Sequence, residues 1–382
     1  MTQPRFVQVH WLASYPSALL NRDDAGLAKR MPFGGVSRGR ISSQCLKRHW
    51  RFAGEASHEA AKRHPFALQN LGIPMGERTK EVVERRIMPA ATAQVSASPE
   101  RVTAVQEALI KHLYGDKAGD KKARQALFFG HPEIAYLAQQ AATALAAETD
   151  KAAVEAIKTF GRSEKGNLAQ MKRDAGLESA LFGRMVTSDR AANRDAAIHV
   201  AHAMTVHELE RELDFMSVVE DLKDSAQGDD AGAAGVFDME LVSGVYYGYA
   251  VVDVPLLVEN LSGDSQAAAQ VVEYLIHLIA TVSPGAKKGS TAPYAYAEHV
   301  LVEVGDAQPR TLANAFREAI PLEGDILARA VASLGRHLEA FDLAYGAGPS
   351  RRQVAVGPNR VTGIEVTSLA EVARWARECL VA

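Results

Sequence analysis

The stretch that most constrains the fold is residues 38–51, where a short strand pattern runs directly into an amphipathic helix. Arg38 and Arg40 are two positions apart, so on an extended segment they point to the same side. Ser42 or Ser43 can cap the helix that follows, which would leave the next backbone N–H groups facing an anion. One amide and three basic side chains of this helix are three and four positions apart, so they share one face, opposite an apolar face. These residues are Gln44, Lys47, Arg48 and Arg51. The stretch therefore predicts a surface that binds several phosphates.

Positive charge is concentrated at this end of the chain. Residues 1–51 contain nine Lys and Arg against two Asp and Glu, which leaves a net charge of −10 on the rest of a chain whose total is −3. Glycines at 34, 35 and 39 are positions where a polymer backbone could come close. The simpler alternative to a phosphate-binding surface is a basic helix that faces solvent and binds nothing. Segregated charge nevertheless indicates an anionic partner better than net charge does.

The same region begins a series of ordered sequence blocks. The first block comprises Asn21-Arg22-Asp23-Asp24, Phe33-Gly34-Gly35 and residues 40–48, and the later blocks are residues 182–188, 201–207, 243–247, 284–287 and 314–316. Together they resemble the CasC family, whose members form the repeated backbone of type I-E CRISPR Cascade complexes. Residues 60–175 match no motif of that family.

The resemblance implies how such a chain would work. Copies of it would polymerise along a guide crRNA as a helical, hexameric filament with other Cascade subunits. They would displace guide bases at regular intervals and leave the segments between to pair with target DNA, so that base pairing supplies the sequence specificity.

The resemblance also implies the residues that do this. The guide backbone would be bound by Arg22, Ser42, Gln44, Lys47 and Arg51. Met185 would hold the kinked nucleotide together with Phe215 and Met216, where the family has Trp-Phe. Lys287 would add another phosphate contact. The full RNA-binding set that we expect also includes Asn21, Arg38, Arg40, Arg48, Arg184 and Lys288, and the residues that would face DNA are Lys158, Lys165, Lys172 and Arg173.

Strand and helix patterns predict an α+β fold. Strands at residues 6–14, 38–41, 243–254 and 299–304, with helices beginning near 43 and 266, suit a ferredoxin-like, RRM-like βαββαβ palm with large insertions. Further helices are expected at 312–319, 326–345 and 369–380, with a short strand at 353–356. The palm would comprise residues 1–58, 177–195 and 244–382.

Two insertions are expected in this palm. Residues 59–176 read as helical fingers, with helices at 79–86, 99–114, 131–147 and 150–159. Residues 196–243 read as a thumb, a protruding β-hairpin with Phe215 and Met216 at its tip. Residues 196–210 suit either a strand or a helix, and we favour one long strand because 243–254 reads as its returning partner.

Catalytic alternatives are weaker. His199, His202 and His207, followed by Glu208 and Asp214, supply metal-ligand types without a known metal spacing. We therefore expect no catalysis, no metal and no cofactor. The rivals are a metal-dependent ribonuclease of the same superfamily, assisted by Asp214, and a standalone single-strand RNA-binding protein. Two distant cysteines and no long apolar segment predict a cytoplasmic protein without membrane contact.

Overall fold

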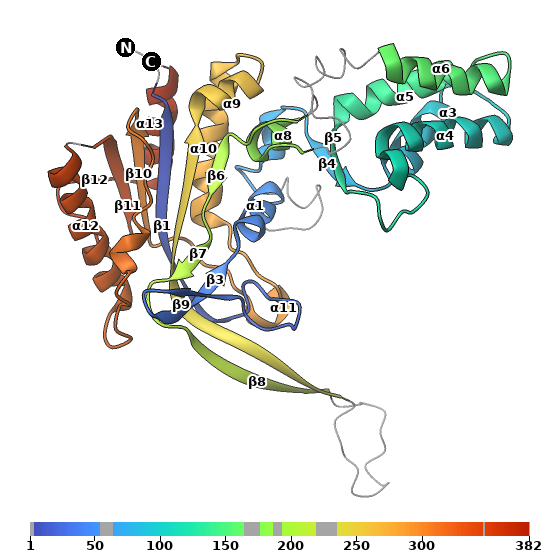
Figure 1. Ribbon diagram of the computed structural model, residues 1–382. Helices are drawn as coiled ribbons and strands as arrows, with labels where there is room; N and C mark the ends of the chain where they lie inside the picture. The colour runs from blue at the N-terminus through green and yellow to red at the C-terminus, as the bar shows by residue number, and fades with distance from the viewer. Residues whose placement is uncertain are drawn as a thin grey trace, which may run out of the picture. The chain divides into compact units, whose positions relative to one another are not determined.

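The computed structural model describes residues 4–53, 64–163, 176–185, 193–218, 235–346 and 348–381 (Figure 1). Two compact units make up the chain. Unit 1 contains Met1–Leu68, Val200–Val252 and Ala269–Ala382, and unit 2 contains Gln69–His199 and Asp253–Ala268. The predicted α+β class is confirmed, since unit 1 is built on a large sheet and unit 2 is mainly helical.

The sheet of unit 1 has the strand order β12-β11-β10-β1-β9-β7-β3-β2. β1 pairs antiparallel with β10, so that Phe6 lies opposite Gly305 and Leu12 opposite His299. All four predicted palm strands are present, whereas β2 and β12 were not predicted. The strands are β1 (Phe6–Ala18), β2 (Arg30–Phe33), β3 (Val36–Ile41), β7 (Ala203–Thr205), β9 (Gly235–Asp253), β10 (His299–Gly305), β11 (Ser350–Ala355) and β12 (Glu365–Val366).

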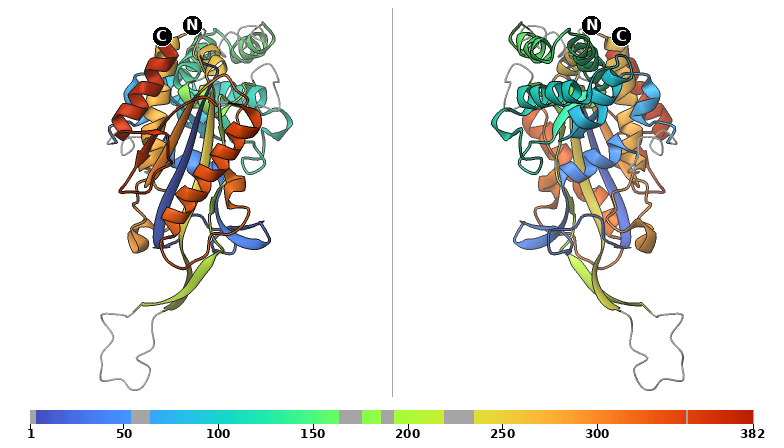
Figure 2. Two further views of the ribbon diagram at one scale, coloured as in Figure 1. Left: turned by 90° about the vertical axis from the view of Figure 1, so that its left-hand side faces the viewer. Right: turned by 90° about the vertical axis from the view of Figure 1, so that its right-hand side faces the viewer.

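Helices cover both faces of this sheet (Figure 2). On one face, Trp11 of β1 packs edge-on against Trp50 of α1 (Ser43–Arg51), with the ring centroids 5.9 Å apart. α10 (Ser265–Thr281) and α13 (Leu369–Val381) are joined by an ion pair between Arg377 and Glu273. On the other face, Leu12 packs in one cluster with Leu334 of α12 (Ile326–Tyr345). Successive side chains of a strand point to opposite faces, which explains why β1 is buried at nearly every position.

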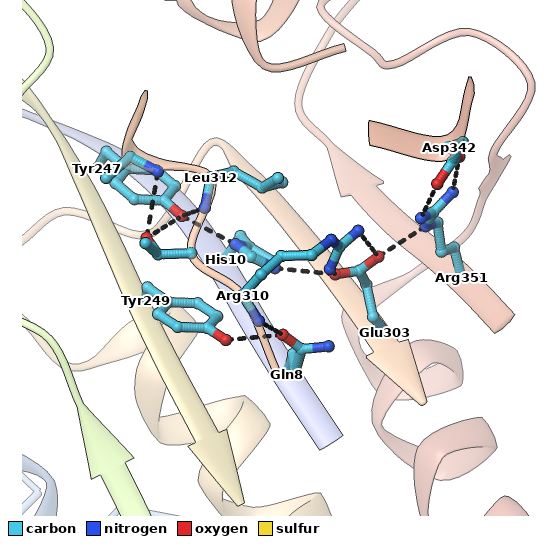
Figure 3. A network of polar contacts seen from close by, with 11 residues as sticks. Gln8, His10, Tyr247, Tyr249, Glu303, Arg310, Leu312, Asp342 and Arg351 are labelled. Carbon is cyan, nitrogen blue, oxygen red and sulfur yellow. Dashed lines mark hydrogen bonds and ion pairs between the residues drawn. The ribbon is translucent and has the colours of Figure 1, made fainter. Parts of the chain in front are cut away.

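A buried polar network lies between the sheet and α12 (Figure 3). Glu303 of β10 is fully buried and accepts two hydrogen bonds from Arg310, at 2.6 and 3.0 Å, and one from Arg351 at 2.7 Å. His10 Nε2 lies 3.1 Å from the same carboxylate, while its Nδ1 lies 2.9 Å from the Tyr247 hydroxyl. Burial lowers the pKa of His10 despite Glu303. A neutral ring that donates from Nε2 and accepts at Nδ1 satisfies both contacts, so these polar groups serve the fold.

Strand β8 (Glu210–Val218) and the first half of β9 form a two-stranded arm (Figure 1). Its register runs from Glu210 opposite Ser243 to Val218 opposite Gly235. Strand was the correct choice for residues 196–210, but one continuous strand was wrong. The chain forms β6 (Ile198–Val200), then β7, and turns again before β8, where the Thr205 hydroxyl donates to the carbonyl of His207.

Unit 2 packs helices around a small sheet. The predicted helices are found as α4 (Pro99–Tyr114), α5 (His131–Leu145) and α6 (Asp150–Ser163). The helix expected at 79–86 is wrong in its first part, because β4 (Gly76–Thr79) pairs with β5 (Leu127–Gly130). A π-helical turn at Val83–Ile87 and α3 (Met88–Thr92) follow β4. The shared core includes Val83, Leu109, Phe129, Leu137 and Ile157.

The remaining elements are short. They are the 3₁₀ turns Leu68–Leu71 and Gly115–Lys117, α8 (Leu177–Phe182), α9 (Val254–Asn260), α11 (Lys288–Thr291) and the 3₁₀ turn Ala313–Phe316, which replaces the helix expected at 312–319. Within the described ranges, no helix combines the length and the apolar character needed to cross a membrane.

Candidate nucleic-acid interface

Helix α1 begins at the predicted cap. Ser42 has extended backbone angles, and its Oγ accepts a 3.3 Å hydrogen bond from the N–H of Cys45. Leu46 and Trp50 are buried against the sheet side. The polar side carries four side chains of the predicted set. Gln44 and Arg48 are exposed, and Lys47 and Arg51 are half-buried. The helix therefore has the two-sided character that the sequence predicts.

The first backbone N–H groups of α1 bond to protein atoms. The N–H of Ser43 donates a 2.9 Å hydrogen bond to His202 Nδ1, and the N–H of Ser42 donates one of the same length to Asn21 Oδ1. The expectation that these amides are left for an anion is therefore wrong for Ser43 and Cys45. They fix the helix to the chain around it, so an anion here would depend on side chains.

Cationic side chains converge beside this helix start. The pKa of His202 is lowered, first by burial and then by the positive charges of Arg40, Lys29 and Lys47. Lys29 is also tied to β3 by its backbone, because its carbonyl accepts a 2.8 Å bond from the N–H of Arg40. The Nε of Arg40 is buried and has no hydrogen-bond partner among the described residues. We refer to Lys29, Arg40 and Lys47 as the basic cluster.

Lys29 was missed from the sequence, although it follows the Asn21–Asp24 loop within the same basic segment. That loop is held by Asp23, whose Oδ1 accepts hydrogen bonds from the N–H groups of Ala25 and Leu27. Asn21 likewise serves the fold through Ser42. Arg22 is exposed, and its backbone forms an antiparallel bridge with Ala28.

Arg38 is not available to RNA, contrary to expectation. Its side chain is 0% exposed and donates to three backbone carbonyls, those of Phe33 at 3.2 Å, Thr205 at 3.1 Å and Phe316 at 2.9 Å. A buried guanidinium can be held by several neutral acceptors. Arg38 therefore joins β2, β7 and the turn at Ala313–Phe316.

The glycines also serve packing within the protein. Gly34 has a φ of +67°, and a Cβ there would lie 1.7 Å from the carbonyl oxygen of Arg317. A Cβ on Gly39 would lie 2.7 Å from the Tyr246 hydroxyl. Of these three glycines, Gly35 is the one at which a Cβ would meet no atom within 4 Å. Gly34 and Gly39 thus allow close approach of other parts of this chain, Arg317 and Tyr246, and not of a bound polymer.

In unit 2, Arg184 is also structural. It forms two hydrogen bonds to Glu133, at 2.8 and 2.9 Å, and both side chains are buried. This pair neutralises the charge of Arg184 inside unit 2, while the expected RNA contact through Arg184 stays a prediction. Met185 beside it is 70% exposed.

Phe215 and Met216 lie on strand β8, not at the hairpin tip. They pair with Asp238 and Phe237 of β9, and the pairing continues for two further positions. Phe215 is 71% exposed, and Leu213, two positions earlier, is 60% exposed. Leu213 was not predicted, although alternation along a strand places it on the same side as Phe215. Residues 219–234, which contain the expected tip, lie outside the described residues.

Of the remaining predicted cations, Lys158, Lys287 and Lys288 lie within the described residues. Lys287 is half-buried and precedes α11, and the ammonium of Lys288 lies 5.8 Å from the centre of the Tyr294 ring. Lys158 is exposed on α6 and 3.7 Å from Glu155. Lys165, Lys172 and Arg173 lie outside the described residues.

The histidines do not form a metal site in the described part of the chain. His207 is buried; its Nδ1 donates to the carbonyl of Glu208 at 2.6 Å, and its Nε2 accepts from the N–H of Val245 at 3.1 Å. His199 is exposed while His207 is buried, so the two do not share an environment. Across the described ranges, no group of three His, Cys, Asp or Glu side chains could hold a metal ion.

Comparisons with known proteins match nearly the whole chain. A family model described as CT1975-like protein matches residues 7–375. Comparison with curated proteins gave no significant match. A chain of a solved "CRISPR RNA-guided surveillance complex, pre-nicking" has a TM-score of 0.78 at 22% identity, covering 98% of this chain and 100% of that one. A chain of a "CRISPR RNA-guided surveillance complex" has a TM-score of 0.67 at 21% identity, covering 97% and 99%. At these identities the likeness is one of fold.

Proposed function

Because this chain belongs to the CT1975-like protein family, we propose that it is a guide-RNA-binding backbone subunit of a CRISPR surveillance complex of the type I-E Cascade kind. The observation that carries the proposal is the basic cluster, where three cations act electrostatically on His202 beside the start of α1 and the buried Nε of Arg40 has no hydrogen-bond partner among the described residues. Positive charges on α1, on β3 and on the residue before β2 suit a phosphate backbone and carry no sequence preference. The titles of the two similar structures name RNA-guided complexes, which supports the same reading.

In this proposal, unit 1 is the palm, the β8–β9 arm is the thumb and unit 2 contains the fingers. Copies would line up along the crRNA, and the arm of one copy would reach the next. The exposed Phe215 and Leu213 supply apolar surface on an arm whose sequence is otherwise acidic. Target DNA would be read by pairing to the guide.

The test is to purify the full chain from cells that transcribe a repeat–spacer array and to sequence the RNA that stays bound. We expect RNA of discrete length that carries spacer sequence. Bound RNA without shared sequence would favour a standalone single-strand RNA-binding protein. Purification without any RNA would contradict the proposal.

We also propose that the subunit does not cut RNA. Asp214, the acid that a ribonuclease reading would use, lies half-buried on β8 among side chains that form no metal-binding group in the described ranges. Incubation of the pure protein with labelled RNA and Mg²⁺ should leave the RNA intact. Cleavage that is lost in Asp214→Asn would establish the ribonuclease alternative.

A further inference from the structure

Two exposed tyrosines lie on the segment between α11 and β10. Tyr294 and Tyr296 are each 70% exposed, although large aromatic side chains are usually buried or half-buried. Between them, Ala295 is pinned inward: its N–H donates to Ser283 Oγ at 2.9 Å, and the same hydroxyl donates to its carbonyl at 2.7 Å. Ala297 is held by a 2.7 Å bond to the carbonyl of Ala280. These hydrogen bonds fix the backbone on either side of Tyr296 and next to Tyr294, and so keep both rings at the surface.

The residues that precede this segment lie beside the end of β1 and beside α1. The N–H of Ala286 donates to the carbonyl of Leu19 at 2.8 Å, and the backbone of Gly285 lies close enough to His49 of α1 to raise the pKa of that histidine against the lowering effect of burial. Lys288 and Arg48 both act electrostatically on His49, so two cations flank this junction. The Lys288 ammonium sits over one face of Tyr294. The rings thus project next to a positively charged surface.

We infer that Tyr294 and Tyr296 are a stacking platform for bases of the single-stranded RNA whose backbone passes along α1. Proteins bind single strands by combining a positive surface that follows the phosphates with aromatic rings on which bases stack. With Lys288 over one face of Tyr294, the opposite face is the one on which a base stacks. This inference rests on the proposed function and adds base contacts to a site otherwise made of phosphate contacts.

The test uses the full chain and two fluorescein-labelled single-stranded RNAs, one of mixed sequence and one in which a central run of nucleotides lacks its bases. Tyr294→Ala with Tyr296→Ala should weaken binding to the mixed-sequence RNA by at least about fivefold per tyrosine, equivalent to about 1 kcal/mol each. Wild type and this variant should bind the abasic RNA equally. Tyr294→Phe with Tyr296→Phe should bind as wild type does, because phenyl rings still stack.

Tyr345→Ala is the matched control, since this tyrosine is also highly exposed but stands at the end of α12 on the other face of the sheet. It should leave both affinities unchanged. Equal losses on both RNAs, or no loss on the mixed-sequence RNA, would overturn the platform while leaving phosphate binding by the wild type intact. If the wild type binds neither RNA, the proposed function falls and the platform falls with it.

Discussion

The N–H of Ser43 donates a 2.9 Å hydrogen bond to Nδ1 of His202, which ties the first turn of α1 to the segment between β6 and β7. Because Nδ1 accepts, the ring is neutral and its proton is on Nε2. Burial and the neighbouring cations lower the pKa of His202 and so favour this form. The basic cluster thus stabilises the acceptor that holds its own helix in place.

Replacing His202 with Ala should lower the free energy of unfolding by about 1 kcal/mol, the usual net value of one hydrogen bond. His202→Asn keeps an acceptor near Nδ1 and should recover most of the loss. Urea unfolding at neutral pH measures both variants. If Ala and Asn are equally stable, the bond to Ser43 contributes nothing measurable.

Arg38 should behave as a structural residue. Arg38→Met removes a buried cation and leaves three carbonyl oxygens without their donor. Each unsatisfied buried acceptor costs about 1–3 kcal/mol, so the loss of stability should exceed about 2 kcal/mol. Urea unfolding gives this value. Among molecules that remain folded, the salt dependence of RNA binding should match that of the wild type, and a flatter dependence would return Arg38 to the RNA site.

Lys47 and Arg51, unlike Arg38, should contribute to RNA binding. Lys47→Ala with Arg51→Ala should weaken RNA binding alike for all sequences and flatten the log–log salt dependence by about 0.7 per lost phosphate contact. The matched control is Arg329→Ala with Arg336→Ala, which removes the same charge from exposed positions on α12, across the sheet. An equal change in both double variants would mean that net charge, and not the α1 surface, controls binding.

Sequence reasoning was most accurate where local signals determine the structure. α4 and α12 begin and end where predicted, because Ser98 and Asp325 cap their first turns and glycines follow their last. β4 and β5 were missed, since Leu127–Gly130 is buried at every position and shows no alternation. Short, fully buried runs carry no periodic signal of their own.

The site was predictable in its helix and less so in its charges. The spacing of residues 44–51 locates the polar side of α1, but sequence cannot distinguish a surface arginine from one enclosed by carbonyls. Arg38 and Arg184 acquire their partners from segments far away in the chain, as Phe316 and Glu133 show. Tertiary contacts of that kind decide which cations face solvent. Tyr294 and Tyr296 were missed because their exposure follows from how Ser283 holds Ala295.

Stability should fall as the pH drops below about 6.5. His299 is fully buried, and burial lowers its pKa to about 4. An unfolded histidine takes up its proton near pH 6.5, so the folded state loses stability as the pH falls from there towards 4, by on the order of 3 kcal/mol for this group. His299→Gln keeps a donor towards Gln353 but does not titrate, so urea midpoints should depend less on pH in the variant. Some dependence should remain, since burial also lowers the pKa of His277 to about 4. Identical pH profiles would contradict the assignment.

The last prediction concerns Phe215 and Met216 on the arm. Because Phe215 is 71% exposed, Phe215→Ala with Met216→Ala should change monomer stability by well under the 2–5 kcal/mol typical of core truncation. If the pair wedges between guide bases, contact with the splayed base offsets an unstacking cost of a few kcal/mol. Fluorescence of 2-aminopurine scanned along a bound guide should then brighten at evenly spaced positions in the wild type and not in the double variant. Leu213→Ala is the control, as an exposed apolar residue on the same strand, and should keep the pattern. If the double variant melts far below the wild type, Phe215 and Met216 are part of a core. If Leu213→Ala also loses the pattern, the arm as a whole distorts the guide, and not these two side chains.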